Sequence, residues 1–171
     1  DSHVVKPLFF PGGDIGKLAI SGTVNDLAVC GAVPRWISCG MIIEEGFAIA
    51  DLEKIVKSMK QTAEQAGVQI VTGDTKVVEK GDADGIYINT SGIGTLIEGV
   101  DLGVHRIRPG DAIIINGFIG DHGAAIIQAR EEFPVSFEIE SDCRPLNRET
   151  VALLSKFDGI RIMRDPTRGG V

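Results

Sequence analysis

The stretch IVTGDTKVV, residues 70–78, decides how the chain is interpreted, because it predicts a buried β-strand that carries charges at its centre. Its two ends are β-branched and apolar, the composition that strands favour. Asp74 and Lys76 would share one face of this strand and Thr75 the other. Two interpretations stay open. Gly73 to Lys76 form either a β-bulge with an exposed ion pair or a site at which Gly73 lets a ligand come close.

The segments on either side predict an α+β fold in which strands and helices alternate. Residues 51–67 are the clearest helix, with Asp51 as its N-cap and Gly67 as its C-terminal stop. Lys80 to Asp82 is a predicted turn. The other predicted strands are 1–10, 36–43, 86–96, 112–117 and 159–163, and the other predicted helices are 14–32, a segment within 117–131, and 145–156. A turn-rich stretch near residues 99–110 predicts two domains, 1–103 and 104–171.

Composition excludes several classes of function. The net charge of −7, without a cluster of Lys or Arg, argues against binding to nucleic acid or to an anionic membrane. No apolar run approaches the roughly 20 residues that span a bilayer. Cys30, Cys39 and Cys143 contain no C-x-x-C pair, so three reduced thiols are expected rather than a zinc site or a disulfide framework. These features predict a cytoplasmic protein.

Two further stretches place acidic side chains where they need an explanation. Asp1 and His3 would share one face of the first strand, although a histidine near a chain end is often simply solvated. Asn25 and Asp26 lie within a largely apolar helix, and a buried carboxylate must be paired, ligated or protonated. Gly22, one turn earlier, would leave the same helix face open to a ligand. The alternative is that the helix breaks and Asp26 caps its second half.

Two glycine-rich turns near the end of the chain are weaker candidates. In residues 165–170, DPTRGG, Thr167 could cap a helix that binds an anion beside Arg168, with Asp165 in the same turn. His122, in the stretch GDHG, is a candidate for catalysis. A capped surface turn and a glycine kept for packing are the competing explanations.

The usual nucleotide-binding loops are missing, so an ATP site would have to rely on carboxylates and divalent ions. The chain contains neither G-x-x-x-x-G-K-[ST] nor a G-x-G-x-x-G that follows a strand. Mg²⁺ is typically held by one or two carboxylates together with waters and phosphate oxygens. Asp1, Asp26 and Asp74 suit such a role.

Taken in order, the blocks DSHVV, VNDLAV, GDTKVV, GDHGAAI and RDPTRGGV closely resemble the HypE family of hydrogenase maturation factors. That family belongs to the PurM-like superfamily, named for aminoimidazole ribonucleotide synthetase. The resemblance covers essentially the whole chain. It implies an N-terminal α+β domain whose strands pair across a homodimer into a barrel flanked by helices, with ATP in the groove between subunits. A second α/β domain would follow.

The resemblance also implies roles for individual residues. Asp1, Asp26 and Asp74 map onto acidic positions that hold Mg²⁺ against the phosphates of ATP. Asn25 and Thr75 would line the same groove. His3, His122, Asp165 and Arg168 are candidates for contact with phosphate or substrate. Lys76, if removed from water beside a metal cation, could serve as the base of an elimination step.

The activity implied is the ATP-dependent dehydration of an S-carbamoyl group on the protein's own C-terminal cysteine, giving a thiocyanate. Its cyano group would pass to the iron of [NiFe]-hydrogenase with the partners HypF and the HypC–HypD complex. The chain is expected to be a fragment lacking both ends, with its second domain truncated and its tail cysteine absent, and therefore to be inactive alone. Another PurM-like phosphoryl-transfer enzyme and a non-catalytic maturation scaffold are the alternatives.

Overall fold

The computed structural model describes residues 1–131 and 138–167. Its strands and helices alternate along the first two thirds of the chain, which confirms the predicted α+β class. None of the described helices is long and apolar enough to cross a membrane. In chain order the elements are β1 (Ser2–His3), β2 (Phe9–Phe10), β3 (Gly13–Asp14), α1 (Ile15–Val29), β4 (Ala32–Glu44), α2 (Ile49–Ala66), β5 (Gln69–Val78), β6 (Ile86–Leu96), the 3₁₀ turn η1 (Val104–Arg106), α3 (Asp121–Ala129) and α4 (Asn147–Leu154).

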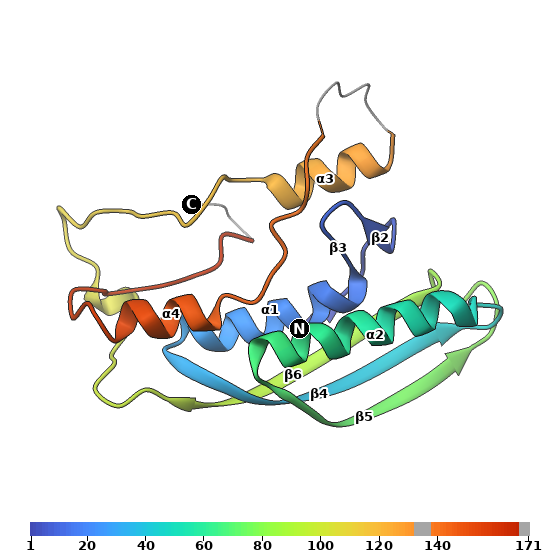
Figure 1. Ribbon diagram of the computed structural model, residues 1–171, viewed down its shortest axis with the longest axis horizontal. Helices are drawn as coiled ribbons and strands as arrows, with labels where there is room; N and C mark the ends of the chain where they lie inside the picture. The colour runs from blue at the N-terminus through green and yellow to red at the C-terminus, as the bar shows by residue number, and fades with distance from the viewer. Residues whose placement is uncertain (132–137, 168–171) are drawn as a thin grey trace.

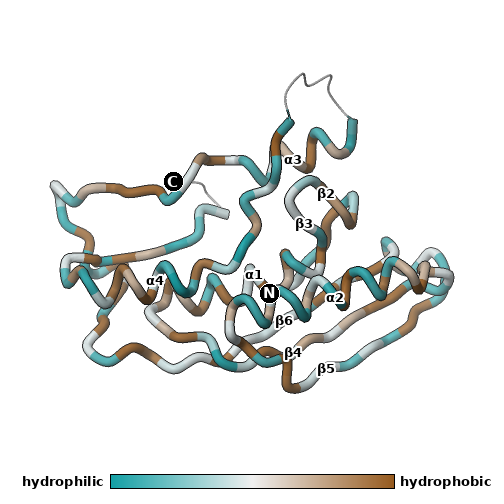
Figure 2. The backbone as a smooth tube through the Cα atoms, in the orientation of Figure 1, coloured by the Kyte–Doolittle hydropathy of each residue, from teal (hydrophilic) through white to brown (hydrophobic). Residues whose placement is uncertain are grey.

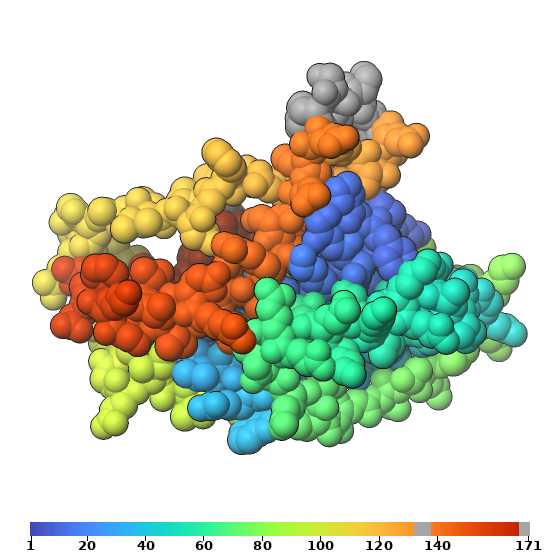
Figure 3. Space-filling model, in the orientation of Figure 1, coloured from blue at the N-terminus to red at the C-terminus, as the bar shows by residue number. Residues whose placement is uncertain are grey.

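A four-stranded sheet forms the base of the molecule, with the strand order β1-β6-β4-β5 (Figure 1). β6 is antiparallel to both β1 and β4, whereas β5 runs parallel to β4 after the crossover through α2. α1 and α2 lie on one face of the sheet, and in the described part of the chain no helix lies on the other face (Figure 1). Figure 3 shows α4 in orange-red and α2 in green to turquoise covering the strands from the viewer's side. β1 and β5 are the two edges of the sheet.

The alternation of side chains along the central strands explains which face carries the core. On β4, Ile37, Cys39 and Ile43 are buried under α1 and α2 and Met41 packs beside them, while Ser38, Gly40 and Ile42 turn to the opposite face. On β6 the buried residues are likewise every second one, from Ile86 to Thr90. Figure 2 shows polar and apolar residues alternating along α2, as expected for a helix that covers a sheet on one side only.

Helix ends follow local chemistry that the sequence reveals only in part. Gly67 ends α2 in the left-handed conformation, with a φ of 72°, as predicted. Asp51 is not the N-cap of α2, because the helix begins after Ala48 and Asp51 lies in its first turn. The cap of α1 is Asp14, whose carboxylate accepts hydrogen bonds from the backbone N–H groups of Gly16 and Lys17.

α1 is continuous, so Asp26 does not cap a second half of a broken helix, and that alternative was wrong. The helix ends at Val29 rather than at residue 32, because Gly31 turns the chain with a φ of 79°. Residues from Ala32 onward are then free to join β4, which is longer than the predicted strand 36–43.

Three predicted strands are not formed as expected. Within residues 1–10 only Ser2–His3 and Phe9–Phe10 are strand, and the second of these pairs with β3 rather than joining the main sheet. Residues 112–117 and 159–163 are not strands either. A strand needs a hydrogen-bonded neighbour, and none of the described elements runs beside either segment as one. Ile113 and Ile114 are consequently 80% and 89% exposed.

The turn between β5 and β6 is present where predicted and is fixed by a carboxylate from β4. Glu44 accepts hydrogen bonds from the backbone nitrogens of Gly81 (2.7 Å) and Gly85 (2.8 Å). These two hydrogen bonds hold the pKa of the Glu44 carboxyl below its ordinary value. The Glu44 side chain therefore links the end of β4 to the turn between β5 and β6.

β5 is an exposed edge strand, so the prediction that it is buried was wrong. Ile70, Val71 and Val77 are 40%, 58% and 61% exposed. Its apolar composition suggested a core strand, but none of the described residues of this chain covers the outer edge of β5. The register shift between β4 and β5 falls between Ile37 and Ser38, opposite Val71, and not at residues 73–76.

Candidate functional site

Asp1 and Asp26 lie along the same face of α1, about one helical turn apart. The carboxylate atom Oδ1 of Asp1 accepts a hydrogen bond from the Ser2 backbone nitrogen at 2.9 Å. A Cβ added to Gly22 would lie only 3.4 Å from the other carboxylate atom, Oδ2, so Asp1 sits against the helix where Gly22 has no side chain. Asp26 is exposed one turn further along, on the same face of α1.

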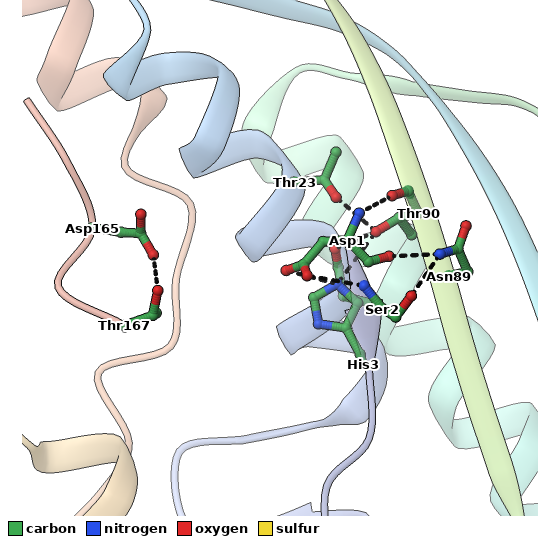
Figure 4. A network of polar contacts seen from close by, with 9 residues as sticks. Asp1, Ser2, His3, Thr23, Asn89, Thr90, Asp165 and Thr167 are labelled. Carbon is green, nitrogen blue, oxygen red and sulfur yellow. Dashed lines mark hydrogen bonds and ion pairs between the residues drawn. The ribbon is translucent and has the colours of Figure 1, made fainter. Parts of the chain in front are cut away.

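His3 lies in the core beside Asp1, so the expectation that it is simply solvated was wrong. Its side chain is only 6% exposed. Its Nε2 atom is 3.3 Å from the Thr90 hydroxyl and 3.6 Å from Asp1 Oδ2 (Figure 4). Burial lowers the pKa of His3 to about 4. The ring is therefore neutral at physiological pH.

Asn25 uses its side-chain amide to hold a later part of the chain. Its Nδ2 donates to the Arg144 carbonyl at 3.0 Å, and its Oδ1 accepts from the Leu146 backbone nitrogen at 2.7 Å. Close by, the Asn147 amide donates to the Ala66 carbonyl at the end of α2. Residues 144–147 are thus docked across the ends of both helices.

Changing Asn25 to Asp should weaken this docking. The substitution replaces the Nδ2 donor by an oxygen that faces the Arg144 carbonyl, so one hydrogen bond is exchanged for repulsion between two acceptors. We expect the free energy of unfolding to fall by about 1–3 kcal/mol in a urea titration. The same amide-to-acid change at Gln61, which is exposed on α2, is the control and should change little. Equal effects at both positions would show that the Asn25 contacts do not stabilise the fold.

Asp74 and Lys76 lie together on the open face of the sheet. The register places Gly40 between Asp74 on β5 and Asn89 on β6, and Ile42 between Lys76 and Tyr87. Both charged side chains are exposed, and Asp74 Oδ1 accepts from the Thr75 backbone nitrogen at 2.9 Å. A cavity of about 580 Å³ lies along this face; its lining includes Ser2, Gly40, Ile42, Asp74, Lys76, Tyr87 and Asn89.

The presence of glycine at position 73 is explained by packing between β4 and β5, which the sequence did not show. A Cβ at this position would lie 2.1 Å from the Cys39 carbonyl oxygen of β4, a distance that real side chains do not adopt. The glycine therefore allows two parallel backbones to approach each other. Thr75 faces the opposite side of the sheet from Asp74 and Lys76, as its position in the strand predicts.

A single chain does not bring the three predicted acidic residues together. Asp1 lies on the α1 side of the sheet, at the β1 edge, whereas Asp74 is on the open face at the β5 edge. Within residues 1–131 and 138–167, no three histidine, cysteine, aspartate or glutamate side chains gather closely enough to hold a metal ion. Asp1 and Asp26 nevertheless supply two carboxylates on one helix face. With waters and phosphate oxygens, such a pair fits the ligands that Mg²⁺ prefers.

The weaker candidates lie elsewhere. His122 lies in the first turn of α3, where its Nδ1 is 3.0 Å from the Ser141 hydroxyl and its ring packs edge-on against Phe10. Burial lowers the pKa of His122, and the charge of Asp142 partly opposes this. Asp165 accepts a hydrogen bond from the Thr167 hydroxyl in a turn apart from the Asp1 cluster (Figure 4). Arg168 lies outside the described residues.

Sequence reasoning missed the polar residues that support Asp1 from β6 and α1. The Thr90 hydroxyl contacts Thr23, His3 and the Ala19 carbonyl, and it is completely buried. The Asn89 amide donates to the Asp1 carbonyl and to the Ser2 hydroxyl. The signal was present as the polar run Asn89 to Ser91 within an otherwise apolar strand.

Comparison with known proteins gives a consistent result. Residues 1–96 match the family described as AIR synthase related protein, N-terminal domain. The carbamoyl dehydratase HypE of Azotobacter vinelandii is 52% identical over the whole chain, which covers 50% of that protein. HypE in a solved HypE–HypF complex is 57% identical, with a TM-score of 0.96, and the match covers all of this chain and 56% of that one.

A second solved structure, HypE in complex with ATP, is 50% identical with a TM-score of 0.95; the match covers 99% of this chain and 51% of that one. The chain therefore spans about half the length of the curated relatives it matches. Identity near one half over every described element, together with the matching domain family, leads to one conclusion. The chain belongs to the HypE family of carbamoyl dehydratases, whose N-terminal domain is of the PurM-like, AIR-synthase-related type.

Proposed function

We propose that the protein to which this chain belongs dehydrates an S-carbamoyl group on its own C-terminal cysteine to a thiocyanate, using ATP and Mg²⁺. The thiocyanate would supply the cyanide ligands of the active-site iron of [NiFe]-hydrogenase. The observation that carries the proposal is the pair Asp1 and Asp26 on a helix face, in a chain about half identical to carbamoyl dehydratases. The acceptor cysteine would lie in the part of the protein beyond residue 171.

The proposed reaction balances as two steps. The carbamoyl oxygen attacks the γ-phosphorus of ATP, ADP leaves, and one proton leaves the carbamoyl nitrogen. Phosphate then departs from the carbon with loss of the second nitrogen proton, which leaves S–C≡N. Phosphorylation is needed because the unmodified carbamoyl oxygen is a poor leaving group.

Roles for this chain's residues follow from that chemistry. Mg²⁺, when bound, would neutralise the charge that develops on the phosphates. Asp1 and Asp26 would hold it, with Asp74 as a third acidic contact, while Asn25 and Thr75 border the same groove. Lys76 would take a proton from the carbamoyl nitrogen. Because Lys76 is exposed in the single chain, this role needs a further surface to remove the amine from water.

A second copy of the chain would supply that surface. The β5 edge exposes Ile70, Val71 and Val77, and the open face exposes Trp36 and Ile93, apolar residues that favour burial. In the barrel that we propose, the β5 edge of one copy would join the β1 edge of the other, since these are the two edges of the sheet. Asp74 and Lys76 of one copy would then approach Asp1 and Asp26 of the second.

Partners and compartment complete the proposal. A solved relative was crystallised as a HypE–HypF complex. HypF as carbamoyl donor, and the HypC–HypD complex as acceptor of the cyano group, are the partners we propose here. The three cysteines are free thiols, which suits the reducing cytoplasm.

The proposal is tested by titrating the full-length protein with ATP in the presence and absence of Mg²⁺. We expect calorimetric binding that depends on Mg²⁺ and is lost in Asp26→Asn. Asp82→Asn, an exposed acid in the turn after β5, is the matched control and should bind as wild type does. Wild-type protein that releases no heat with Mg²⁺ and ATP would overturn the proposal.

A further inference from the structure

We propose that His3 is a positioning residue for Asp1, holding its carboxylate toward the face of α1 through a proton on Nε2. The inference rests on the proposed role of Asp1 as a metal-binding residue. It assigns His3 a place behind the site rather than in contact with phosphate or substrate, because the ring is buried between β1 and α1.

The hydrogen bonds around Thr90 determine where the histidine proton lies. The Thr90 hydroxyl donates its single hydrogen to the Ala19 carbonyl at 3.2 Å. In this assignment the hydroxyl accepts from its other two neighbours, the Thr23 hydroxyl at 2.6 Å and His3 Nε2 at 3.3 Å. We assign the proton to Nε2 on this basis; the same atom is 3.6 Å from Asp1 Oδ2, so its N–H faces Thr90 and Asp1 together.

Both oxygens of Asp1 are consequently oriented by groups on the chain. The Ser2 backbone N–H fixes Oδ1 at 2.9 Å, and the positive end of the His3 N–H dipole lies near Oδ2. The carboxylate remains 41% exposed, so it can still reach a ligand. Ligating carboxylates in proteins are commonly oriented by outer-shell partners, and loss of such a partner weakens metal binding.

Gly22 provides the space for this arrangement. A Cβ at Gly22 would lie 3.0 Å from His3 Cε1 and 3.4 Å from Asp1 Oδ2. Glycine inside a helix is less favourable than alanine by about 1 kcal/mol, so its presence in α1 calls for a reason. Close packing of His3 and Asp1 on the helix is that reason, and it corrects the expectation that Gly22 leaves room for a ligand.

The test compares His3→Leu, His3→Gln and Asp1→Asn in the full-length protein by titrating Mg²⁺ calorimetrically at fixed ATP. We expect His3→Leu to weaken the apparent Mg²⁺ affinity about 10-fold, the lower end of the effect of losing an outer-shell partner. His3→Gln should stay close to wild type, because its amide N–H can take the place of Nε2–H. ATP binding without Mg²⁺ should be the same in all three.

The outcomes separate this inference from the proposed function. If Asp1→Asn loses Mg²⁺ affinity while His3→Leu does not, the inference is wrong and the role of Asp1 stands. If Asp1→Asn binds Mg²⁺ as wild type does, the metal site itself is wrong and the inference falls with it. Equal losses in His3→Gln and His3→Leu would overturn the N–H argument. If His3→Leu does not fold, Gly22→Ala gives the same test, since it displaces the ring without removing it.

Discussion

Mixing two inactive variants of the full-length protein, Asp26→Asn and Asp74→Asn, should restore ATP-dependent activity. Each variant alone is expected to lose about 100-fold or more in rate, since each lacks one carboxylate that would hold Mg²⁺ against the transferring phosphate. After unfolding and joint refolding, half of the dimers should be mixed, and one of their two sites should be intact. The recovered rate would then be about one quarter of wild type, because a two-fold dimer pairs each copy with one partner.

The reason is the position of the two residues in the sheet. Asp26 lies on α1, above one face, and Asp74 lies on the β5 edge, facing the other way. Wild type mixed with the double variant is the decisive control. A site shared between copies leaves no intact site in that mixed dimer, whereas a site within one chain leaves one. Because wild-type homodimers also form, the shared site predicts about one quarter of the wild-type rate in this control, and a site within one chain predicts about one half. About one half in the control, together with no recovery in the first mixture, would refute the shared site.

Gly73→Val should destabilise the fold more than any other single change considered. Valine would place its Cβ 2.1 Å from the Cys39 carbonyl oxygen, so β4 and β5 could not keep their parallel pairing. The clash is with backbone atoms of Cys39, so no side chain can move aside to relieve it. We expect the free energy of unfolding to fall by at least about 3 kcal/mol, as for the most disruptive core changes.

Urea unfolding of Gly73→Val and of a matched variant measures this effect. Gly159→Ala is the control, since a Cβ at Gly159 meets nothing within 4 Å and should change stability by less than about 0.5 kcal/mol. A Gly73→Val protein as stable as Gly159→Ala would mean that β5 is not anchored to β4 at this point. The glycine would then have to be explained by a ligand after all.

Much of the fold could be predicted because local signals agreed with the final packing. The apolar spacing over residues 51–67 and the stop at Gly67 gave α2, and the β-branched runs gave β5 and β6. What failed was the inference of burial from composition. Residues 70–78 and 112–117 have strand-like sequences, yet a sequence does not say which neighbour covers or pairs with them.

The candidate site was predictable in its residue types but not in its arrangement. Asp1, Asp26 and Asp74 were identified as acids in unusual places, and the first two do share one helix face. Their separation from Asp74 follows from the strand order, which no single stretch of sequence encodes. The support from Thr90 was missed because a threonine in a strand is ordinary until its neighbours are known.

The docking of residues 144–147 links the two halves of the chain mechanically. Asn25, which grips that segment, is the immediate neighbour of Asp26, which faces the proposed nucleotide. The same turn of α1 therefore contacts residues 144–146 and carries the proposed metal-binding residue Asp26. A ligand that shifted this turn would change the hydrogen bond between Asn25 and Leu146. By reciprocity, a movement of residues 144–147 would change the affinity for that ligand. The position of the later half of the chain would then be coupled to ligand binding in the first half.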